Sequence, residues 1–143
     1  MEQTLPLKGK RIFYAEDDVK NRVGLQIVLY RAGADVKIGR SDNLENMMMM
    51  LRMSLPLNLI ILDLMYGKGM TGYDIFNAIQ EDDSLTGIPV IAFSAADPSA
   101  EIPRVKAAGM QGFIAKPMNV QEFPLQILSV IDGHEIWYEG ILS

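Results

Sequence analysis

The stretch LIILDLMYGKG, residues 59–69, determines how the rest of the chain is interpreted. A four-residue apolar run ends in a single carboxylate, Asp63, and is followed by a loop that contains two glycines. An uninterrupted apolar run bounded by turn residues is typical of a strand buried on both faces of a parallel sheet. Open α/β sheets keep their ligand sites at the carboxyl ends of such strands. We therefore expect Asp63 to be a functional carboxylate.

Four more short apolar runs alternate with amphipathic stretches along the chain. The five predicted strands are Arg11–Ala15, Asp35–Ile38, Leu59–Leu62, Pro89–Phe93 and Gly112–Ala115. Between strands, apolar residues recur at helical spacing, as Val23, Ile27 and Tyr30 do before Gly33, which we expect to end that helix. Asn119 is a predicted N-cap for the last helix. This alternation predicts an α/β fold with a parallel sheet and helices on both faces.

Composition and charge exclude several classes of protein. The 143 residues include no cysteine, so disulfide bonds and thiolate metal sites are excluded. No apolar run approaches the ~20 residues of a membrane span, and the first ten residues lack the apolar region of a secretory signal. A net charge of −5 with scattered Lys and Arg offers no basic patch for nucleic acid. We expect a cytoplasmic protein that binds neither membranes nor nucleic acid directly.

The length fits one hydrophobic core, and hence one domain. We assign residues 1–9 to an N-terminal extension, 10–132 to the domain and 133–143 to a C-terminal tail. The tail contains Ile136, Trp137 and Tyr138, and it is either a docking segment or the beginning of a further domain. Its His134 is the only histidine of the chain and is expected to be exposed, without a chemical role.

Polar side chains stand at the carboxyl ends of four predicted strands. They are Glu16, Asp17 and Asp18 after the first, Asp63 after the third, Ser94 after the fourth and Lys116 after the fifth. In a doubly wound sheet these ends converge at one edge. Carboxylates about 4–5 Å apart repel by roughly 3–4 kcal/mol per pair at an effective dielectric constant near 20, so the cluster needs a cation. Oxygen ligands with room for water favour Mg²⁺.

With Mg²⁺ in place, Asp63 can attack an incoming phosphoryl group and form an aspartyl phosphate. The metal and Lys116 would neutralise charge on the phosphoryl oxygens, and Ser94 can donate a hydrogen bond to them. Each residue alone has an ordinary structural explanation, as a solvated loop residue, a helix cap, a turn hydroxyl or a surface charge. Their joint placement favours the chemical interpretation.

These residues resemble the receiver domains of two-component response regulators, over residues 10–131. AEDD at 15–18 with Arg22 is similar to the family's acidic pair, and LIILDLM to its phosphoacceptor strand. PVIAFSA contains the switch position at Ser94, and GMQGFIAKPM contains the aromatic position at Phe113 and the Lys-Pro pair. The resemblance implies a flavodoxin-like, doubly wound five-stranded sheet of order 2-1-3-4-5 for a receiver domain at 10–132.

The resemblance also implies a role for each site residue. Asp63 is the phosphoacceptor; Asp17, Asp63 and the backbone carbonyl of Met65 hold Mg²⁺, and Glu16 acts through water. Ser94, Lys116 and Phe113 are the phosphoryl-binding and switch residues, although Phe113 also fits an ordinary core position. The Lys116–Pro117 bond is expected to be cis. The phosphoryl group comes from a histidine kinase or a histidine phosphotransfer protein, and the signal passes by contact to a downstream protein.

Two other classes of function stay open from the sequence. A pseudo-receiver keeps the fold but acts as a protein-interaction module without phosphorylation. A Mg²⁺-dependent phosphohydrolase of the haloacid-dehalogenase type also uses an aspartate at a strand end, but its second aspartate is replaced here by Met65. We expect no enzyme activity beyond Mg²⁺-assisted self-phosphorylation and slow autodephosphorylation, because Met65 and Ala96 cannot bind the hydrolytic water by a strong hydrogen bond.

Two segments depart from the expected pattern. The loop after Asp63 has no proline and has one extra residue before Gly72; Gly67 and Gly69 are expected to make it pliable and to alter the surface over Lys68 and Met70. In the second predicted helix, Met49, Met50 and Met53 lie opposite the core stripe that contains Met47, Met48 and Leu51. These three methionines are either a partner surface, including a homodimer contact, or incidental surface residues.

Overall fold

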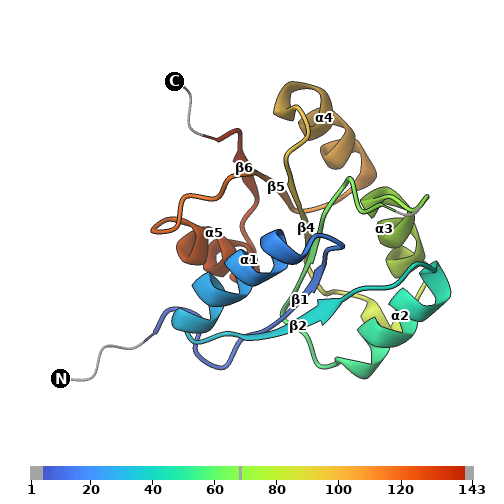
Figure 1. Ribbon diagram of the computed structural model, residues 1–143, viewed down its shortest axis with the longest axis horizontal. Coiled ribbons are helices and arrows are strands. Elements are labelled where there is room, and N and C mark those ends of the chain that lie inside the picture. Colours follow the sequence, from blue (N-terminus) through green and yellow to red (C-terminus); the bar gives the residue numbers. More distant parts are fainter. Residues whose placement is uncertain (1–4, 68, 141–143) are drawn as a thin grey trace.

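A parallel sheet forms the centre of the computed structural model, which describes residues 5–67 and 69–140. Within these residues the sheet has six strands in the order β2-β1-β3-β4-β5-β6 (Figure 1). The strands are β1 (Arg11–Ala15), β2 (Asp35–Gly39), β3 (Leu59–Leu62), β4 (Val90–Ser94), β5 (Gly112–Ala115) and β6 (Ile136–Tyr138). The five expected strands and the order 2-1-3-4-5 are confirmed, with strand ends within one residue of the prediction.

Five α-helices cover the two faces of this sheet in the described part of the chain. They are α1 (Val19–Arg31), α2 (Leu44–Met53), α3 (Gly72–Gln80), α4 (Pro98–Ala108) and α5 (Phe123–Ile131), with a 3-10 turn η1 at Asp83–Leu85. Side chains of α2, α3 and α4 form one buried apolar cluster, and those of α1 and α5 form the other. The expected doubly wound arrangement is therefore confirmed.

Strand β3 shows why the sheet is buried on both faces. Leu59 and Ile61 pack in the cluster with α1 and α5, whereas Ile60 and Leu62 pack in the cluster with α2, α3 and α4. Successive side chains of a strand point to opposite faces, so an unbroken apolar run suits a sheet that has helices on both sides. This strand carries Asp63 to the carboxyl edge of the sheet.

Helix α1 is confirmed, but the apolar residues that indicate it are not those that it buries. Leu25 and Leu29 are buried, whereas Val23, Ile27 and Tyr30 are 47%, 46% and 77% exposed. The helix has apolar residues on both faces, and the sequence pattern alone does not say which face meets the sheet. An exposed apolar stripe therefore runs along α1.

The two helix-end predictions differ in outcome. Gly33, at φ +100°, follows the C-cap of α1 and ends this helix as expected. Helix α5 begins only at Phe123, with Pro124 in its first turn. The Asn119 side chain accepts hydrogen bonds of 3.1 Å from the backbone N–H groups of Gln121 and Glu122, so it caps the turn that precedes α5.

The C-terminal segment adds strand β6, which corrects the expectation of a five-stranded sheet. It pairs in parallel with β5, with Ile136 opposite Gly112, Trp137 opposite Phe113 and Tyr138 opposite Ile114. A Cβ atom at Gly112 would lie 2.7 Å from the backbone oxygen of Ile136, so glycine permits this approach. Three residues are too few for a strand period to be recognised. His134 is exposed, as expected.

The N-terminal segment is also packed. Leu7, which lies in the segment assigned to an extension, is fully buried, and its N–H donates to the backbone oxygen of Ala32 at 2.9 Å. No helix in the described ranges is long and apolar enough to cross a membrane. Leu7 therefore packs with the domain, although it precedes the expected domain boundary at Lys10.

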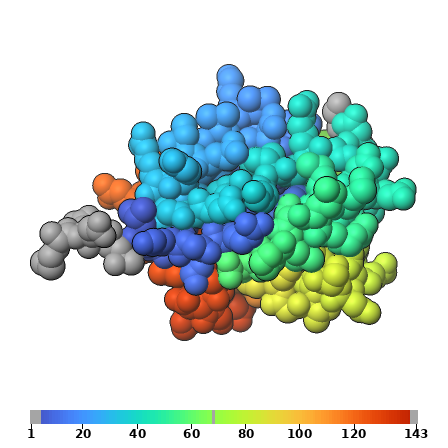
Figure 2. Space-filling model, turned by 90° about the horizontal axis from the view of Figure 1, so that it is seen from below, coloured from blue at the N-terminus to red at the C-terminus, as the bar shows by residue number. Residues whose placement is uncertain are grey.

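The three methionines of α2 that were expected on one surface separate into two environments. Met49 and Met53 are 48% and 79% exposed, but Met50 is half-buried and packs against the core. Figure 2 shows α2, in teal and green, beside the yellow segment after α3, where Arg52 pairs with Asp82 at 2.8 Å. The expectation that Met50 belongs to an exposed surface is therefore wrong.

Candidate phosphoacceptor site

Three buried polar side chains meet the carboxyl edge of the sheet. Glu16 is 1% exposed, Asp63 is 7% exposed and Ser94 is fully buried; apart from tyrosines, no other polar or charged side chain is buried in the described part of the chain. They follow or end β1, β3 and β4, which are neighbours in the sheet. Burial of polar groups is costly, so their collection at one edge marks this edge for chemistry.

Lys116 joins two of these carboxylates. Its Nζ lies 3.1 Å from Glu16 Oε2 and 3.4 Å from Asp63 Oδ2, and its side chain is 10% exposed. The ammonium also lies 5.2 Å from the centre of the Phe93 ring. The Lys116–Pro117 bond is cis, as expected, and so is Leu55–Pro56, which was not foreseen. The structure thus places a cation against the expected phosphoacceptor.

The two carboxylates have different protonation behaviour. Burial and the neighbouring Glu16 raise the pKa of Asp63 to about 6, against the opposing effects of the Lys116 charge and the Met65 N–H. Burial also disfavours the charge on Glu16, but hydrogen bonds with Asp63 and Tyr14 and the charge of Lys116 hold the pKa of Glu16 below its ordinary value. Two close carboxyl groups push each other's pKa apart, so negative charge remains to be neutralised.

The backbone around Asp63 fixes its position. The Met65 N–H donates to Asp63 Oδ1 at 3.0 Å, and the Asp63 N–H donates to the Ala15 backbone oxygen at 3.2 Å. Gly72, the first residue of α3, packs so closely that a Cβ atom there would lie 2.7 Å from the Asp63 backbone oxygen. Glycine at position 72 is therefore required by the close contact between α3 and the end of β3.

The loop after Asp63 is anchored by a tyrosine. Tyr66 is buried, and its hydroxyl donates to the Ser41 backbone oxygen at 2.9 Å and accepts from the Ser41 N–H at 2.7 Å. Gly67 and Gly69 have positive φ, which glycine adopts readily. The hydrogen bonds of Tyr66 to Ser41 nevertheless hold the loop in place between Asp63 and Gly67. Met70 is buried, so the expectation that it forms part of the surface is wrong; Lys68 lies outside the described residues.

The remaining acidic residues have other contacts. Asp18 caps α1 by accepting from the Asn21 N–H at 3.1 Å. Asp17 is half-buried, and its Oδ1 lies 3.8 Å from Arg40 Nε. A pocket of about 570 Å³ opens beside Glu16, Asp17 and Asp63. The structure therefore brings Glu16, Asp63 and Lys116 into direct contact, with Asp17 at the rim of the same pocket.

The donor set fits Mg²⁺ although it is not a preformed cage. Among residues 5–67 and 69–140, no three Asp, Glu, His or Cys side chains are arranged as a metal site. Mg²⁺ keeps several waters and is held through one or two carboxylates together with phosphate oxygens, so a cage is not required. Four carboxylates, those of Glu16, Asp17, Asp18 and Asp63, line the pocket and supply the oxygen ligands that a hard cation prefers.

Ser94 is the last residue of β4, and Phe113 lies within β5. The Ser94 hydroxyl oxygen accepts from the Ala96 N–H at 3.1 Å, and the Ser94 backbone oxygen accepts from the Lys116 N–H at 2.9 Å. Phe113 is fully buried in the core, opposite Trp137 of β6. Trp137 is half-buried, and Lys106 Nζ lies 4.9 Å from its ring centre.

Tyr14 belongs to the site but was not predicted. Its hydroxyl donates to Glu16 Oε2 at 2.7 Å, and its ring is fully buried. The signal was present in the sequence, because residues two apart on a strand point to the same face and Tyr14 precedes Glu16 by two positions. Trp137 was also missed, since its place depends on the pairing of β6.

Residues 12–128 match the sequence profile of the response regulator receiver domain. The chain belongs to the receiver-domain family. The match covers every candidate residue of the site, from Tyr14 to Lys116, and it ends before β6. The receiver domain therefore carries β6 outside the part that the family shares.

Curated relatives of this receiver domain include plant and bacterial regulators. It is 27% identical over 122 residues to the two-component response regulator ARR17 of Arabidopsis thaliana, covering 85% of this chain and 69% of the relative. It is 35% identical over 66 residues to ARR8 of the same plant, 46% of this chain but only 29% of ARR8. It is 30% identical over 64 residues to the chemotaxis protein CheY of Pseudomonas aeruginosa, 45% of this chain and 52% of CheY.

Solved structures support the fold. CheY4 of Vibrio cholerae superposes with a TM-score of 0.71 at 19% identity, covering 85% of this chain and 98% of CheY4. A receiver domain from Colwellia psychrerythraea has a TM-score of 0.71 at 26% identity, covering 86% and 98%. The receiver domain of a Pseudomonas aeruginosa sensor histidine kinase, with magnesium in its active-site cleft, has a TM-score of 0.70 at 22% identity, covering 87% and 98%.

Proposed function

We propose that this receiver domain is a phosphoacceptor switch, in which Asp63 receives a phosphoryl group from a histidine kinase or a histidine phosphotransfer protein with the help of Mg²⁺. The observation that carries the proposal is the position of Asp63: buried at the end of β3, paired with Lys116 at 3.4 Å, and facing a pocket. A buried carboxylate that faces a pocket, with a pKa shifted by burial and by a charged neighbour, is a candidate functional group.

The chemistry follows from the contacts of Asp63. The Met65 N–H binds Oδ1, while Oδ2 faces Lys116. The carboxylate attacks phosphorus, the bond from phosphorus to the donor's histidine nitrogen breaks, and that nitrogen leaves with the bonding electron pair. Lys116 can hold a phosphoryl oxygen. Mg²⁺, held by Asp17, Asp63 and the Met65 carbonyl with Glu16 acting through water, would neutralise charge on the phosphoryl oxygens.

Ser94 can respond to the phosphoryl group. Because its hydroxyl oxygen accepts from the Ala96 N–H, its own hydrogen remains available for a phosphoryl oxygen. Movement of Ser94 would shift the loop between β4 and α4 and then Phe113. Since Trp137 lies opposite Phe113, β6 would take part in the change together with α4 and α5. The downstream protein would recognise this altered surface by contact.

A protein donor fits the surface around the pocket. To reach Asp63 it must contact the rim, where Val19 and Met65 are 58% and 67% exposed. From Val19 the exposed stripe of α1 continues through Val23, Ile27 and Tyr30 at helical spacing. An exposed apolar stripe that begins at the site supports a macromolecular phosphodonor. Such a switch would act in the cytoplasm, and its exposed Met49 and Met53 offer a second contact for a partner or another copy.

The test is intact mass after incubation with Mg²⁺ and acetyl phosphate. We expect a gain of one phosphoryl group, abolished by Asp63→Asn and by a chelator, and lost slowly after the donor is removed because Met65 and Ala96 cannot orient water. Absence of any gain, also with phosphohistidine donors, would refute the proposal and favour a phosphorylation-independent pseudo-receiver. A phosphoryl half-life of seconds would refute only the slow loss.

A further inference from the structure

Tyr14 lies beneath Glu16 on β1, and its hydroxyl is the shortest of the contacts to that carboxylate. The distance from the Tyr14 hydroxyl to Glu16 Oε2 is 2.7 Å, in a site where Tyr14 is fully buried and Glu16 is 1% exposed. Burial and the charge of Glu16 raise the pKa of Tyr14 far above its ordinary value, so its hydroxyl remains a donor. Hydrogen bonds to a charged group are stronger than those between neutral groups.

The Glu16 carboxylate is held from both sides. Oε2 accepts from the Tyr14 hydroxyl and from Lys116 Nζ. Oε1 accepts from the Asp18 N–H at 3.2 Å and from Asn21 Nδ2 at 3.4 Å. Because Lys116 also contacts Asp63, the position of Glu16 decides how the ammonium is shared between the two carboxylates. The hydrogen bond from the Tyr14 hydroxyl to Glu16 therefore affects Asp63 indirectly, through Lys116.

The ring of Tyr14 is fixed, so its hydroxyl has a defined position. The ring packs at a tilt against Phe93, with ring centres 6.1 Å apart, and Phe93 packs against Phe123 at 5.1 Å. Lys116 Nζ lies above the same Phe93 ring. Three packed aromatic side chains, from β1, β4 and α5, thus support the site: Tyr14 contacts Glu16, and Phe93 contacts Lys116.

We propose that Tyr14 is a positioning residue of the phosphoacceptor site, holding Glu16 Oε2 against Lys116, beside Asp63. Glutamate has one more rotatable methylene than aspartate, and a Glu16 carboxylate that is free to turn would no longer hold Lys116 between the two carboxylates. The tether keeps Lys116 within reach of Asp63 and keeps Glu16 in place to act through water. This inference rests on the proposed function of Asp63.

The variant that tests it is Tyr14→Phe, which keeps the ring and removes the hydroxyl. We expect the rate of phosphorylation by acetyl phosphate to fall about tenfold and the dissociation constant for Mg²⁺, measured by calorimetry, to rise several-fold, as loss of one hydrogen bond to a charged group implies. Tyr73→Phe is the matched control, because the Tyr73 hydroxyl also donates to a carboxylate, Glu101 Oε2 at 2.6 Å, but this bond joins α3 to α4 away from the phosphoacceptor site. It should leave both values unchanged.

A double-mutant cycle separates positioning from packing. Aspartate at position 16 is too short to reach the Tyr14 hydroxyl, so Tyr14→Phe should have no further effect in the Glu16→Asp background. An equal loss in both backgrounds would show a merely structural role and overturn the proposal. In the unsubstituted protein, the protected hydroxyl proton of Tyr14 should shift in NMR spectra when Mg²⁺ is added; an unchanged resonance would also count against it.

The outcomes distinguish this proposal from the proposed function. If the wild-type chain is phosphorylated and Tyr14→Phe matches it in rate and in Mg²⁺ affinity, Tyr14 has no positioning role while the function of Asp63 stands. If the wild-type chain is not phosphorylated, the proposed function fails. The Mg²⁺ affinities of the cycle then still decide whether Tyr14 positions Glu16.

Discussion

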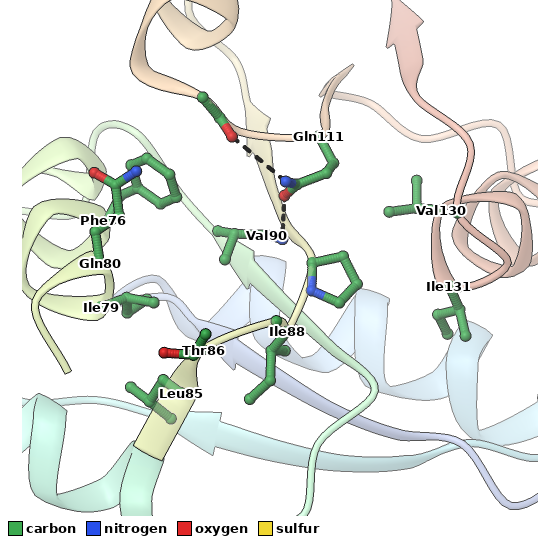
Figure 3. A pocket seen from close by; sticks show the side chains of 14 residues that line it. Phe76, Ile79, Gln80, Leu85, Thr86, Ile88, Val90, Gln111, Val130 and Ile131 are labelled. Atoms are coloured by element: carbon green, nitrogen blue, oxygen red, sulfur yellow. Dashed lines mark hydrogen bonds between the residues drawn. The ribbon is translucent and has the colours of Figure 1, made fainter. Parts of the chain in front are cut away.

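The two edges of the sheet each have a hollow, and the two hollows differ in chemistry. At the carboxyl edge a pocket of about 570 Å³ is lined mostly by polar and charged residues, among them Glu16, Asp17 and Asp63. At the amino edge a pocket of about 500 Å³ lies between α3, β4 and α5, and none of its lining side chains is charged (Figure 3).

One polar side chain of the amino-edge pocket, Gln111, is hydrogen-bonded to the backbone. Gln111 accepts from the Val90 N–H at 2.8 Å and donates to the Gly109 backbone oxygen at 3.4 Å, and Figure 3 shows both bonds. At the carboxyl edge, Asp63 and Lys116 still have capacity for a ligand. The two pockets are similar in size, but buried charged side chains line only the one at the carboxyl edge. Buried charge, and not concavity, therefore distinguishes the candidate functional edge.

The largest effect should come from the cation at the carboxyl edge. Lys116→Met removes the ammonium that contacts both Glu16 and Asp63, and we expect the rate of phosphorylation by acetyl phosphate to fall about 100-fold or more. Lys106→Met is the control, because Lys106 contacts Trp137 and not the site. Equal rates for Lys116→Met and the wild type would show that the buried charge at the carboxyl edge is not needed for phosphorylation.

Stability should respond in opposite directions at the two edges. Because burial raises the pKa of Asp63 to about 6, its ionised form opposes folding above pH 6, and this cost disappears as the pH falls toward 4. Asp63→Asn should therefore raise the free energy of unfolding at pH 7.5 by about 1–2 kcal/mol, with a difference that narrows at low pH.

Gln111→Ala is the counterpart at the amino edge. It leaves the Val90 N–H without its partner, so the free energy of unfolding should fall by about 1–3 kcal/mol while the phosphorylation rate stays the same. Urea titrations at several pH values and acetyl phosphate assays measure both quantities. A stability loss in Asp63→Asn at pH 7.5, or a rate loss in Gln111→Ala, would contradict the comparison.

The reaction should depend on pH at the carboxyl edge. Asp63 must be ionised to attack phosphorus, so at low Mg²⁺ the initial rate should fall about tenfold per pH unit below pH 6. Saturating Mg²⁺ favours the carboxylate and should move this midpoint to lower pH. Initial rates with acetyl phosphate between pH 5 and 8 test this; a flat profile down to pH 5 would contradict a raised pKa.

The smallest expected change is spectroscopic. Trp137 is the only tryptophan of the chain and lies opposite Phe113 in the β5–β6 register. Phosphorylation should change its fluorescence intensity modestly, and Asp63→Asn treated in the same way should show no change. Unaltered emission in a fully phosphorylated sample would mean that β6 does not follow the switch.

Much of this arrangement could be predicted from the sequence, because local patterns carry it. The run before Asp63 is apolar on both faces of β3, and the polar residues 16, 63, 94 and 116 follow strands that the sheet order brings together. Other features depend on tertiary contacts that no local pattern encodes. Strand β6 has three residues, Tyr66 finds its partner at Ser41, and Met50 faces the core because of how α2 is rotated.

The position of the phosphoryl group tests most directly whether Asp63 is the phosphoacceptor. After incubation with Mg²⁺ and acetyl phosphate, borohydride reduction converts an aspartyl phosphate to homoserine, which peptide mass spectrometry locates. We expect homoserine at position 63, and at no other acidic residue of the carboxyl edge. Homoserine at position 17 or 18, or none in a sample that has gained a phosphoryl group, would contradict it.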